Sequence, residues 1–256
     1  MNKIILGEKI ETKIDDNIKI NIEDKYENIK TITIDVIHNT DIIFSFHENQ
    51  KLDININIPK NKNCNIIEFK DNGKYKVQYK YNLEKNSYLN ITKINDAKKT
   101  KEMILFNLNG ENAKVEYLLK TIAKKEEKYS LMVYHNQKNT VSNITNHGIN
   151  ILDGQITFDV SGFVPNGITG CTINQNNRII NLTDNKCEIK PNLFIDENDV
   201  IANHSAHIGK CSDEKMFYLR SRGINKKDAE SLLIKGFLTS KLDQKDQIEK
   251  IINKYW

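Results

Sequence analysis

Hydrophobic and polar residues alternate one by one along most of the chain. In residues 52–58 four apolar side chains alternate with Asp and Asn, and in residues 75–81 Tyr and Val alternate with Lys and Gln. Residues 149–160 continue the same habit. A period of two is typical of strands with one buried face, so we expect residues 10 to about 200 to form many short strands.

Turn residues separate these runs. The predicted turn segments are DNGK (71–74), NGEN (109–112), LDGQ (152–155) and VPNG (164–167). The chain has three prolines, and all fall at the ends of predicted strands, where a missing N–H is tolerated. A sandwich, a barrel and a β-helix all fit this pattern, because no repeat of fixed length can be identified.

The period changes after Gly209. Ser212 is a good N-cap with acidic residues behind it, and Gly223 stands where a left-handed residue would end a helix. Asn225 is expected to cap a second helix with Asp228 in a capping box. The second helix has an apolar stripe at helical spacing, made of Ala229, Leu232, Leu233, Gly236 and Phe237.

A third amphipathic stretch, Ile248, Ile251, Ile252 and Tyr255, reaches the last residues. We therefore predict helices near 212–222, 226–240 and 244–254. The chain would divide into a β domain over residues 1–208 and a small helical domain over 209–256.

The amino-acid composition argues against several classes of protein. The net charge of +4 comes from 38 basic and 34 acidic residues that are well mixed, so electrostatics do not demand a nucleic-acid partner. No stretch approaches the ~18 apolar residues of a membrane span, and the first residues are too short an apolar run for a signal peptide. Four dispersed cysteines form no disulfide-like pattern, which favours a reduced, cytoplasmic setting.

The segment HSAHIGKCSDEKMFYLRSRGI (204–224), followed by DAESLLIKGF (228–237), resembles the C-terminal signature of the SufB/SufD family of iron–sulfur cluster assembly proteins. The matching positions are His204, Ala206, Gly209, Asp213, Phe217, Tyr218, Leu219, Ser221, Arg222, Gly223 and Ile224. Weaker matches at 108–117, 140–149 and 175–200 follow in the family's order, so the likeness covers about residues 105–240.

This resemblance implies a right-handed parallel β-helix with a C-terminal helical domain that covers one exposed end. It implies a non-catalytic scaffold that pairs with a second SufB/SufD-type scaffold or with a second copy of itself. It also implies docking of a SufC-like ABC-type ATPase on the helices. ATP hydrolysis would belong to that partner, because the chain has no glycine-rich phosphate loop. An iron–sulfur cluster would be bound only transiently, shared across the scaffold dimer.

The resemblance makes His204 a candidate metal ligand at the scaffold interface. His207 and Cys211 are weaker candidates, and without the family both histidines are expected to be turn residues. Cys211 precedes a helix N-terminus, whose dipole would lower its thiol pKa. Asn176 stands where SufB-type members have a cysteine, so the chain is more similar to a SufD-type or a minimal single scaffold.

The candidate partner-binding residues lie in the helical part. They are Phe217, Tyr218, Arg220, Arg222, Gly223, Ile224 and Phe237. The apolar members could instead form helical core, which makes Tyr218 and Arg222 the better candidates for contact with a partner.

Two other classes of protein remain as alternatives. A β-helix enzyme acting on carbohydrate would need paired carboxylates on neighbouring coils, and no aspartate stands in a recognisable pair. A helix-turn-helix nucleic-acid-binding protein would place the helix after Gly223 against DNA, but that helix mixes lysines with acidic residues.

Overall fold

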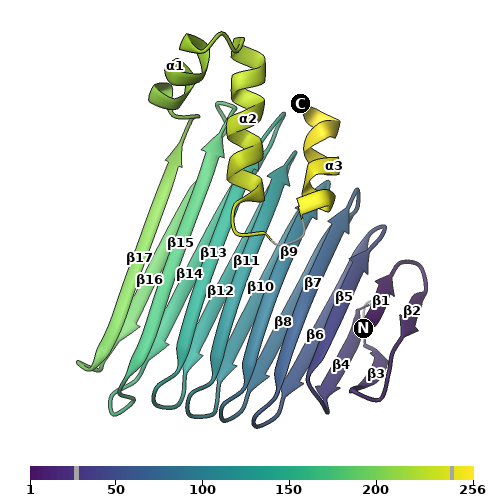
Figure 1. Ribbon diagram of the computed structural model, residues 1–256. Helices are drawn as coiled ribbons and strands as arrows, with labels where there is room; N and C mark the ends of the chain where they lie inside the picture. Colours follow the sequence, from purple (N-terminus) through teal and green to yellow (C-terminus); the bar gives the residue numbers. More distant parts are fainter. Residues whose placement is uncertain (26–28, 243–244) are drawn as a thin grey trace.

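The described part of the chain folds into a flattened parallel solenoid with two facing sheets and three C-terminal helices (Figure 1). The computed structural model describes residues 1–25, 29–242 and 245–256. The strands are β1 (Asn2–Leu6), β2 (Ile10–Lys13), β3 (Ile18–Asp24), β4 (Lys30–Val36), β5 (Thr40–Phe46), β6 (Gln50–Ile58), β7 (Asn63–Asp71), β8 (Lys74–Leu83), β9 (Tyr88–Asp96), β10 (Lys99–Leu108), β11 (Lys114–Ala123), β12 (Glu126–His135), β13 (Val141–Asn150), β14 (Gln155–Val164), β15 (Cys171–Asn181), β16 (Glu188–Ile195) and β17 (Val200–Gly209).

From β4 onward, successive strands fall alternately into the two sheets. The nine-stranded sheet has the order β17-β15-β13-β11-β9-β7-β5-β1-β2, and the eight-stranded sheet has the order β16-β14-β12-β10-β8-β6-β4-β3. From β4 onward every strand pairs in parallel with strands two positions away in the chain, which confirms the predicted parallel β-helix.

The coils differ in length, which explains why no fixed repeat is visible in the sequence. Cys64 is paired with Leu89, 25 residues on, whereas Ser142 is paired with Ile173, 31 residues on. The extra residues lie in the turns, so the inward and outward alternation within each strand is preserved.

Asparagine has a structural role at the turns. Asn61, Asn86, Asn112 and Asn139 all adopt left-handed φ values between 54° and 61°. Asparagine tolerates that conformation better than other side chains with a Cβ. The stacked amides also join the coils, since Asn86 Nδ2 donates to Asn61 Oδ1 and Asn112 Nδ2 to Asn86 Oδ1, each at 2.9 Å.

The first strands depart from the parallel pattern. β1 pairs with β2, and β3 with β4, in antiparallel register. The prediction of parallel strands throughout is therefore wrong for these two pairs, which form the N-terminal end of the solenoid.

The space between the sheets holds the hydrophobic core and a buried group of charges. Lys70 and Lys93 lie between Glu68 and Glu102, and all four side chains are at most 2% exposed. Lys93 Nζ lies 2.9 Å from Glu102 and 3.1 Å from Glu68, and Lys70 contacts both carboxylates. Burial opposes the charge of Lys70, but the two carboxylates outweigh it and raise its pKa. The quartet is neutral as a whole, so each buried charge has a partner.

Three helices follow the solenoid, as predicted: α1 (Asp213–Ser221), α2 (Lys226–Thr239) and α3 (Lys245–Tyr255). Ser212 caps α1 by accepting from the N–H of Lys215, and Asn225 caps α2 by accepting from the N–H of Asp228 at 2.9 Å. Gly223 has φ +86°, the left-handed conformation expected after a helix end. Residue 244, the predicted start of the third helix, lies outside the described residues.

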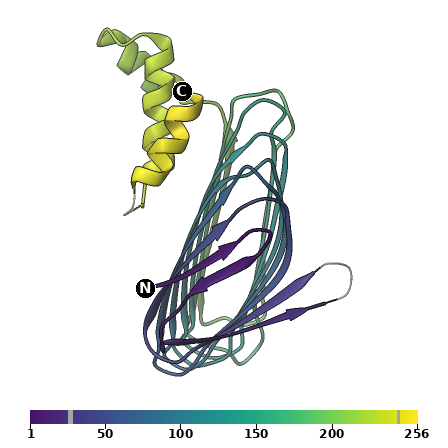
Figure 2. The same ribbon diagram turned by 90° about the vertical axis from the view of Figure 1, so that its right-hand side faces the viewer.

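The helices do not cover the end of the solenoid, so that expectation from the resemblance is wrong. Figure 2 shows them beside one wall of the solenoid. The outer face of the nine-stranded sheet carries three buried isoleucines, Ile94, Ile122 and Ile149, which pack against α2 and α3. An apolar patch on an outer sheet face must be covered to leave water, and the helices cover it.

The apolar stripe predicted for α2 is also partly wrong. Ala229 is buried, but Ile234 and Leu238 fill the core in place of Leu232, which is 49% exposed, and Gly236. α2 contacts β13 on one side and both α1 and α3 on others, so a single stripe does not describe it. The α3 stripe is confirmed, with Ile248 and Ile252 buried. No helix in the described part of the chain combines the length and the apolar character that a membrane crossing requires.

Candidate functional site

The C-terminal end of the solenoid is open. β17 pairs with β15, and β16 pairs with β14; no further strand of the described chain continues either sheet beyond them. Their inner positions extend the rows of the core but are only half-buried or exposed, as for Leu193 on β16 and Ala202 on β17. This end therefore presents two unpaired strand edges around an apolar centre.

His204 and His207 lie within strand β17 and not in a turn. His204 pairs with Gln175, a buried residue of the inner row, so it takes an inner position at the open end. His207 pairs with Arg178, which pairs with His147 on the outer face. Because residues three apart on a strand point to opposite faces, the two histidines cannot converge on one metal ion.

Cys211 lies beyond the far end of β17. Gly209 lies five positions after His204 along the strand, about 17 Å away at the usual rise, so Cys211 and His204 are not brought together. Burial, followed by the charge of Glu230, raises the pKa of Cys211, which is opposite to the lowering expected from the helix dipole. Burial also raises the pKa of Cys187, the other half-buried thiol of this region.

The described residues contain no group of three or more His, Cys, Asp or Glu side chains with the geometry of a metal site. Of the three candidate ligands, His204 alone faces the open end.

The α1–α2 hairpin, defined as residues 213–239, holds all seven candidate partner-binding residues. None of the residues of α1 is buried, and Phe217 and Tyr218 are 76% and 58% exposed. Arg222 lies over the Tyr218 ring, 5.4 Å from its centroid. Arg220 and Gly223 are also exposed, whereas Ile224 is half-buried.

A groove of about 760 Å³ runs between this hairpin and the solenoid. Phe217 and Arg220 line it from α1, and Leu182 and Cys211 line it from the solenoid side. An exposed aromatic residue beside an arginine is the kind of pair that forms strong contacts in protein interfaces.

Phe237 differs from the other candidates, because it faces the solenoid. Its ring stacks on His147 with centroids 4.5 Å apart. Lys120 Nζ donates to the Phe237 carbonyl at 3.1 Å and to Ser240 Oγ at 3.0 Å, so it caps the C-terminal end of α2. Burial, followed by Lys241 and Arg178, lowers the pKa of Lys120 to about 7. Phe237 thus helps to fasten the helices to the sheet.

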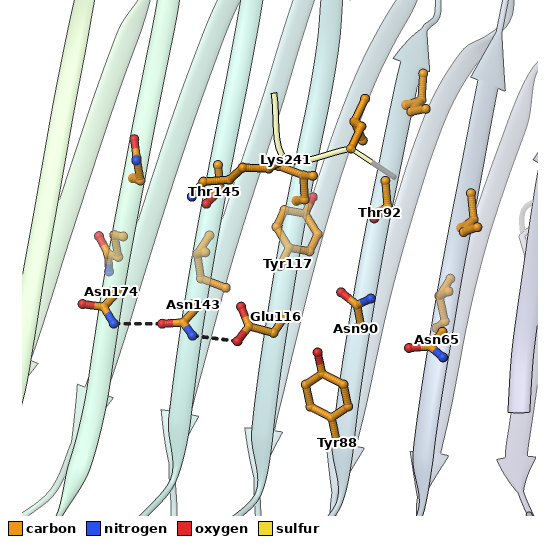
Figure 3. Close-up of a pocket in the computed structure, with 18 of the residues that line it drawn as sticks. Asn65, Tyr88, Asn90, Thr92, Glu116, Tyr117, Asn143, Thr145, Asn174 and Lys241 are labelled. Carbon is orange, nitrogen blue, oxygen red and sulfur yellow. Dashed lines mark hydrogen bonds between the residues drawn. The ribbon is translucent and has the colours of Figure 1, made fainter. Parts of the chain in front are cut away.

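Sequence reasoning did not single out a second, polar groove of about 930 Å³ on the outer face of the nine-stranded sheet (Figure 3). Asn174 donates to Asn143, and Asn143 to Glu116, each at 2.8 Å across neighbouring coils. Lys241 also lines it, and in the figure it lies between Thr145 and Thr92. Polar residues that recur every 26 to 31 positions are its sequence signal, but the unequal coils hide that spacing.

Comparison with known proteins identifies a family whose members are similar to this chain. A family model described as the SufBD core domain of SUF system FeS cluster assembly matches residues 39–237. The chain is 33% identical over 113 residues to the iron–sulfur cluster assembly protein SufD of Bacillus subtilis, which covers 44% of this chain and 26% of that relative.

Two further relatives give the same likeness. The chain is 48% identical over 50 residues to SufD of Escherichia coli, covering 20% of the chain and 12% of that protein. It is 36% identical over 91 residues to an iron–sulfur cluster assembly SufBD family protein of Synechocystis, covering 35% and 20%. The matched segments thus span about a quarter or less of these relatives' lengths.

Proposed function

Because the chain belongs to the SufB/SufD family of iron–sulfur cluster assembly proteins, we propose that it is a non-catalytic scaffold subunit of a Suf-type assembly complex in the cytoplasm. The open end of its solenoid pairs with a second scaffold, either a relative or a second copy. The α1–α2 hairpin docks a SufC-like ABC-type ATPase, which supplies ATP hydrolysis. The iron–sulfur cluster is a transient cargo of the paired scaffolds.

The observation that carries this proposal is the open end formed by β16 and β17. Unpaired strand edges are templates for pairing with another chain, and soluble proteins usually blunt or cover them. Here the edge is ten residues long in β17, with Ile201 and Ile208 exposed by 64% and 42%. A second solenoid end offers the complementary backbone groups and apolar surface, as two-fold interfaces do.

His204 is the residue through which pairing of the scaffolds would affect binding of the iron–sulfur cluster. It lies at an inner position of the open end, so in a paired complex it would face the partner scaffold. A neutral imidazole can ligate iron, but one histidine does not hold a cluster. If the partner is a relative, that relative supplies the thiolates, since Asn176 has no thiol and Cys211 lies beyond the C-terminal end of β17. If the partner is a second copy, the two His204 side chains would need Cys211 or Cys187 as further ligands.

The hairpin supports the docking part of the proposal. α1 contributes nothing to the core of this chain, yet it exposes Phe217 and Tyr218 next to Arg220 and Arg222. Large exposed apolar side chains grouped on one short helix indicate a contact surface for another protein.

The carbohydrate-enzyme alternative gains no support. A glycosidase needs two carboxyl groups, about 5 to 9.5 Å apart. Among the described residues that line the polar groove, Glu116 is the single carboxylate, and it accepts a hydrogen bond from Asn143.

The role of His204 as a ligand of the cluster is tested by His204→Ala in the assembled complex, with His207→Ala as the matched control on the other face of the strand. We expect His204→Ala to leave assembly intact while iron and sulfide content falls, and His207→Ala to change neither. A normal cluster yield from the His204→Ala complex would remove this histidine from the cargo site.

The docking surface is tested by Phe217→Ser with Tyr218→Ser. Because α1 has no buried residue, the variant should keep its melting temperature but lose co-purification with the ATPase. Leu152→Ser, at a side chain that is 71% exposed elsewhere on the solenoid, is the control for loss of an exposed apolar group. Undiminished ATPase binding by the double variant would reject the hairpin as the docking surface.

A further inference from the structure

Four lysines form a straight row on the outer face of the eight-stranded sheet. Register pairs Lys51 with Lys76, Lys76 with Lys101, and Lys101 with Lys128, on the neighbouring strands β6, β8, β10 and β12. All four side chains are exposed. Neighbouring strands lie about 4.8 Å apart, so this lysine ladder presents four cations over about 14 Å.

A second, shorter row lies beside the lysine ladder. Lys74 pairs with Lys99, two positions along the same strands. Together, five lysines, Lys51, Lys74, Lys76, Lys99 and Lys101, line a groove of about 570 Å³, with Asn49, Gln50 and Tyr75 completing the wall.

The positive charge of this groove is largely unbalanced. Glu126 pairs with Lys99 at 2.8 Å and with Lys128 at 2.7 Å. Within the described residues no carboxylate lies within salt-bridge distance of the other lysines that line the groove. Like charges directly opposite one another weaken a sheet, so the arrangement is unfavourable for the free protein. An anionic ligand would relieve that repulsion.

We propose that the lysine ladder and its groove bind a linear oligophosphate, either an inorganic chain or the phosphate chain of a nucleotide. A row of compact ammonium groups on flexible stems suits phosphate oxygens, which need point charges from several directions. Carboxylates on one face of an extended acidic peptide recur only about every 6.6 Å, a poorer match to rungs about 4.8 Å apart. Tyr75, the one aromatic residue of the groove, is 3% exposed, so no ring is offered for stacking of nucleic-acid bases.

The test is calorimetric titration of the full chain with inorganic tripolyphosphate at about 50 mM salt. The ladder variant carries Lys76→Gln with Lys101→Gln, which removes the two central charges and keeps polar side chains on the exposed face. We expect its dissociation constant to rise at least about tenfold, and wild-type binding to weaken steeply as salt is added. The matched control, Lys3→Gln with Lys80→Gln, removes two exposed lysines outside the ladder and should change the constant less than about twofold.

Two further measurements keep the result unambiguous. The melting temperature of the ligand-free ladder variant should equal or exceed that of the wild type, so lost binding cannot be attributed to unfolding. ATP should bind within about threefold of tripolyphosphate if the phosphate chain is what is recognised. Equal binding by the ladder variant and the wild type, no binding by either, or tighter binding of an oligoglutamate peptide would overturn the proposal.

Discussion

Replacing the buried Glu127 by Gln should change how the stability of the solenoid depends on pH. Glu127 lies on β12 between the sheets and is fully buried. It accepts hydrogen bonds from the hydroxyls of Thr121 and Tyr129 and from Asn95 Nδ2. No lysine forms an ion pair with it among the described residues, in contrast to the nearby quartet of charges.

Burial raises the pKa of Glu127 from 4.5 to about 7, although the hydrogen bonds from Thr121 and Tyr129 act in the opposite direction. The folded chain therefore holds this proton more tightly than the unfolded chain. The stabilisation is fully present below pH 4.5 and is lost as pH rises through about 7. Each pKa unit is worth about 1.4 kcal/mol, so the loss between pH 5 and pH 8 is about 2 to 3 kcal/mol.

Glu127→Gln removes the titrating group and keeps its shape. The Oδ1 atom of Asn95 has no hydrogen-bond donor among the described residues, so a flip of that amide would supply an acceptor for the new amide nitrogen. Urea unfolding followed by circular dichroism gives the free energy of unfolding of both proteins at pH 5 and pH 8. Relative to the wild type, the variant should be more stable at pH 8 than at pH 5 by about 2 to 3 kcal/mol.

Glu126→Gln is the matched control, one residue away on the outer face. Hydrogen bonds from Lys128 and Lys99 lower the pKa of Glu126 to about 2, so its contribution is lost only as pH falls below 4.5. The stability difference between Glu126→Gln and the wild type should therefore be the same at pH 5 and at pH 8. A Glu127→Gln stability difference that stays constant over this range would refute a protonated Glu127 in the folded core.

Two other predictions follow from buried contacts. Glu102→Gln leaves Lys70 and Lys93 with too little negative charge, so it should lower the free energy of unfolding by about 3 to 5 kcal/mol. Glu102→Leu with Lys93→Met removes a balanced pair, so this double variant should recover most of the lost free energy. Urea titrations measure both values. Equal losses in both variants would contradict this reasoning. Gly110→Ala should lower the free energy of unfolding by about 3 kcal/mol, because its Cβ would lie 1.8 Å from a backbone nitrogen of the preceding coil. Gly236→Ala, on the open face of α2, should instead raise the free energy of unfolding by about 0.5 to 1 kcal/mol in thermal melts. An unchanged free energy of unfolding in Gly110→Ala would mean that the coils can separate locally, which would contradict this reasoning.

Much of the local structure is predictable from the sequence because it depends on neighbouring residues. The period of two in residues 75–81 becomes strand β8, with its tyrosines inside and its lysines outside. Ser212, Gly223 and Asn225 mark helix ends, since their side chains or their φ freedom satisfy backbone groups within a few positions. The family motif near residues 217–224 is also local, and the comparisons confirm the family that it indicated.

Some side chains have a local pattern that is compatible with two different surroundings. Ile94, Ile122 and Ile149 read as ordinary strand isoleucines, but they are on the outer face and are buried only because α2 and α3 pack there. Leu232 continues a helical stripe in sequence and is nevertheless exposed, since α2 contacts other elements on several sides. Burial in these cases is set by which elements meet, and that information is not contained in the spacing along one element.

The candidate sites depend most on tertiary structure. The sequence makes both His204 and His207 candidate ligands, but the strand that contains them places them on opposite faces. Lys51, Lys76, Lys101 and Lys128 are unremarkable in a lysine-rich sequence, because their alignment exists only in the register of four strands. The sequence by itself determined the strands, the helices and the family. The unequal coils, the open end and the juxtaposed charges were decided by the tertiary structure, because they depend on contacts between residues about 25 to 30 positions apart.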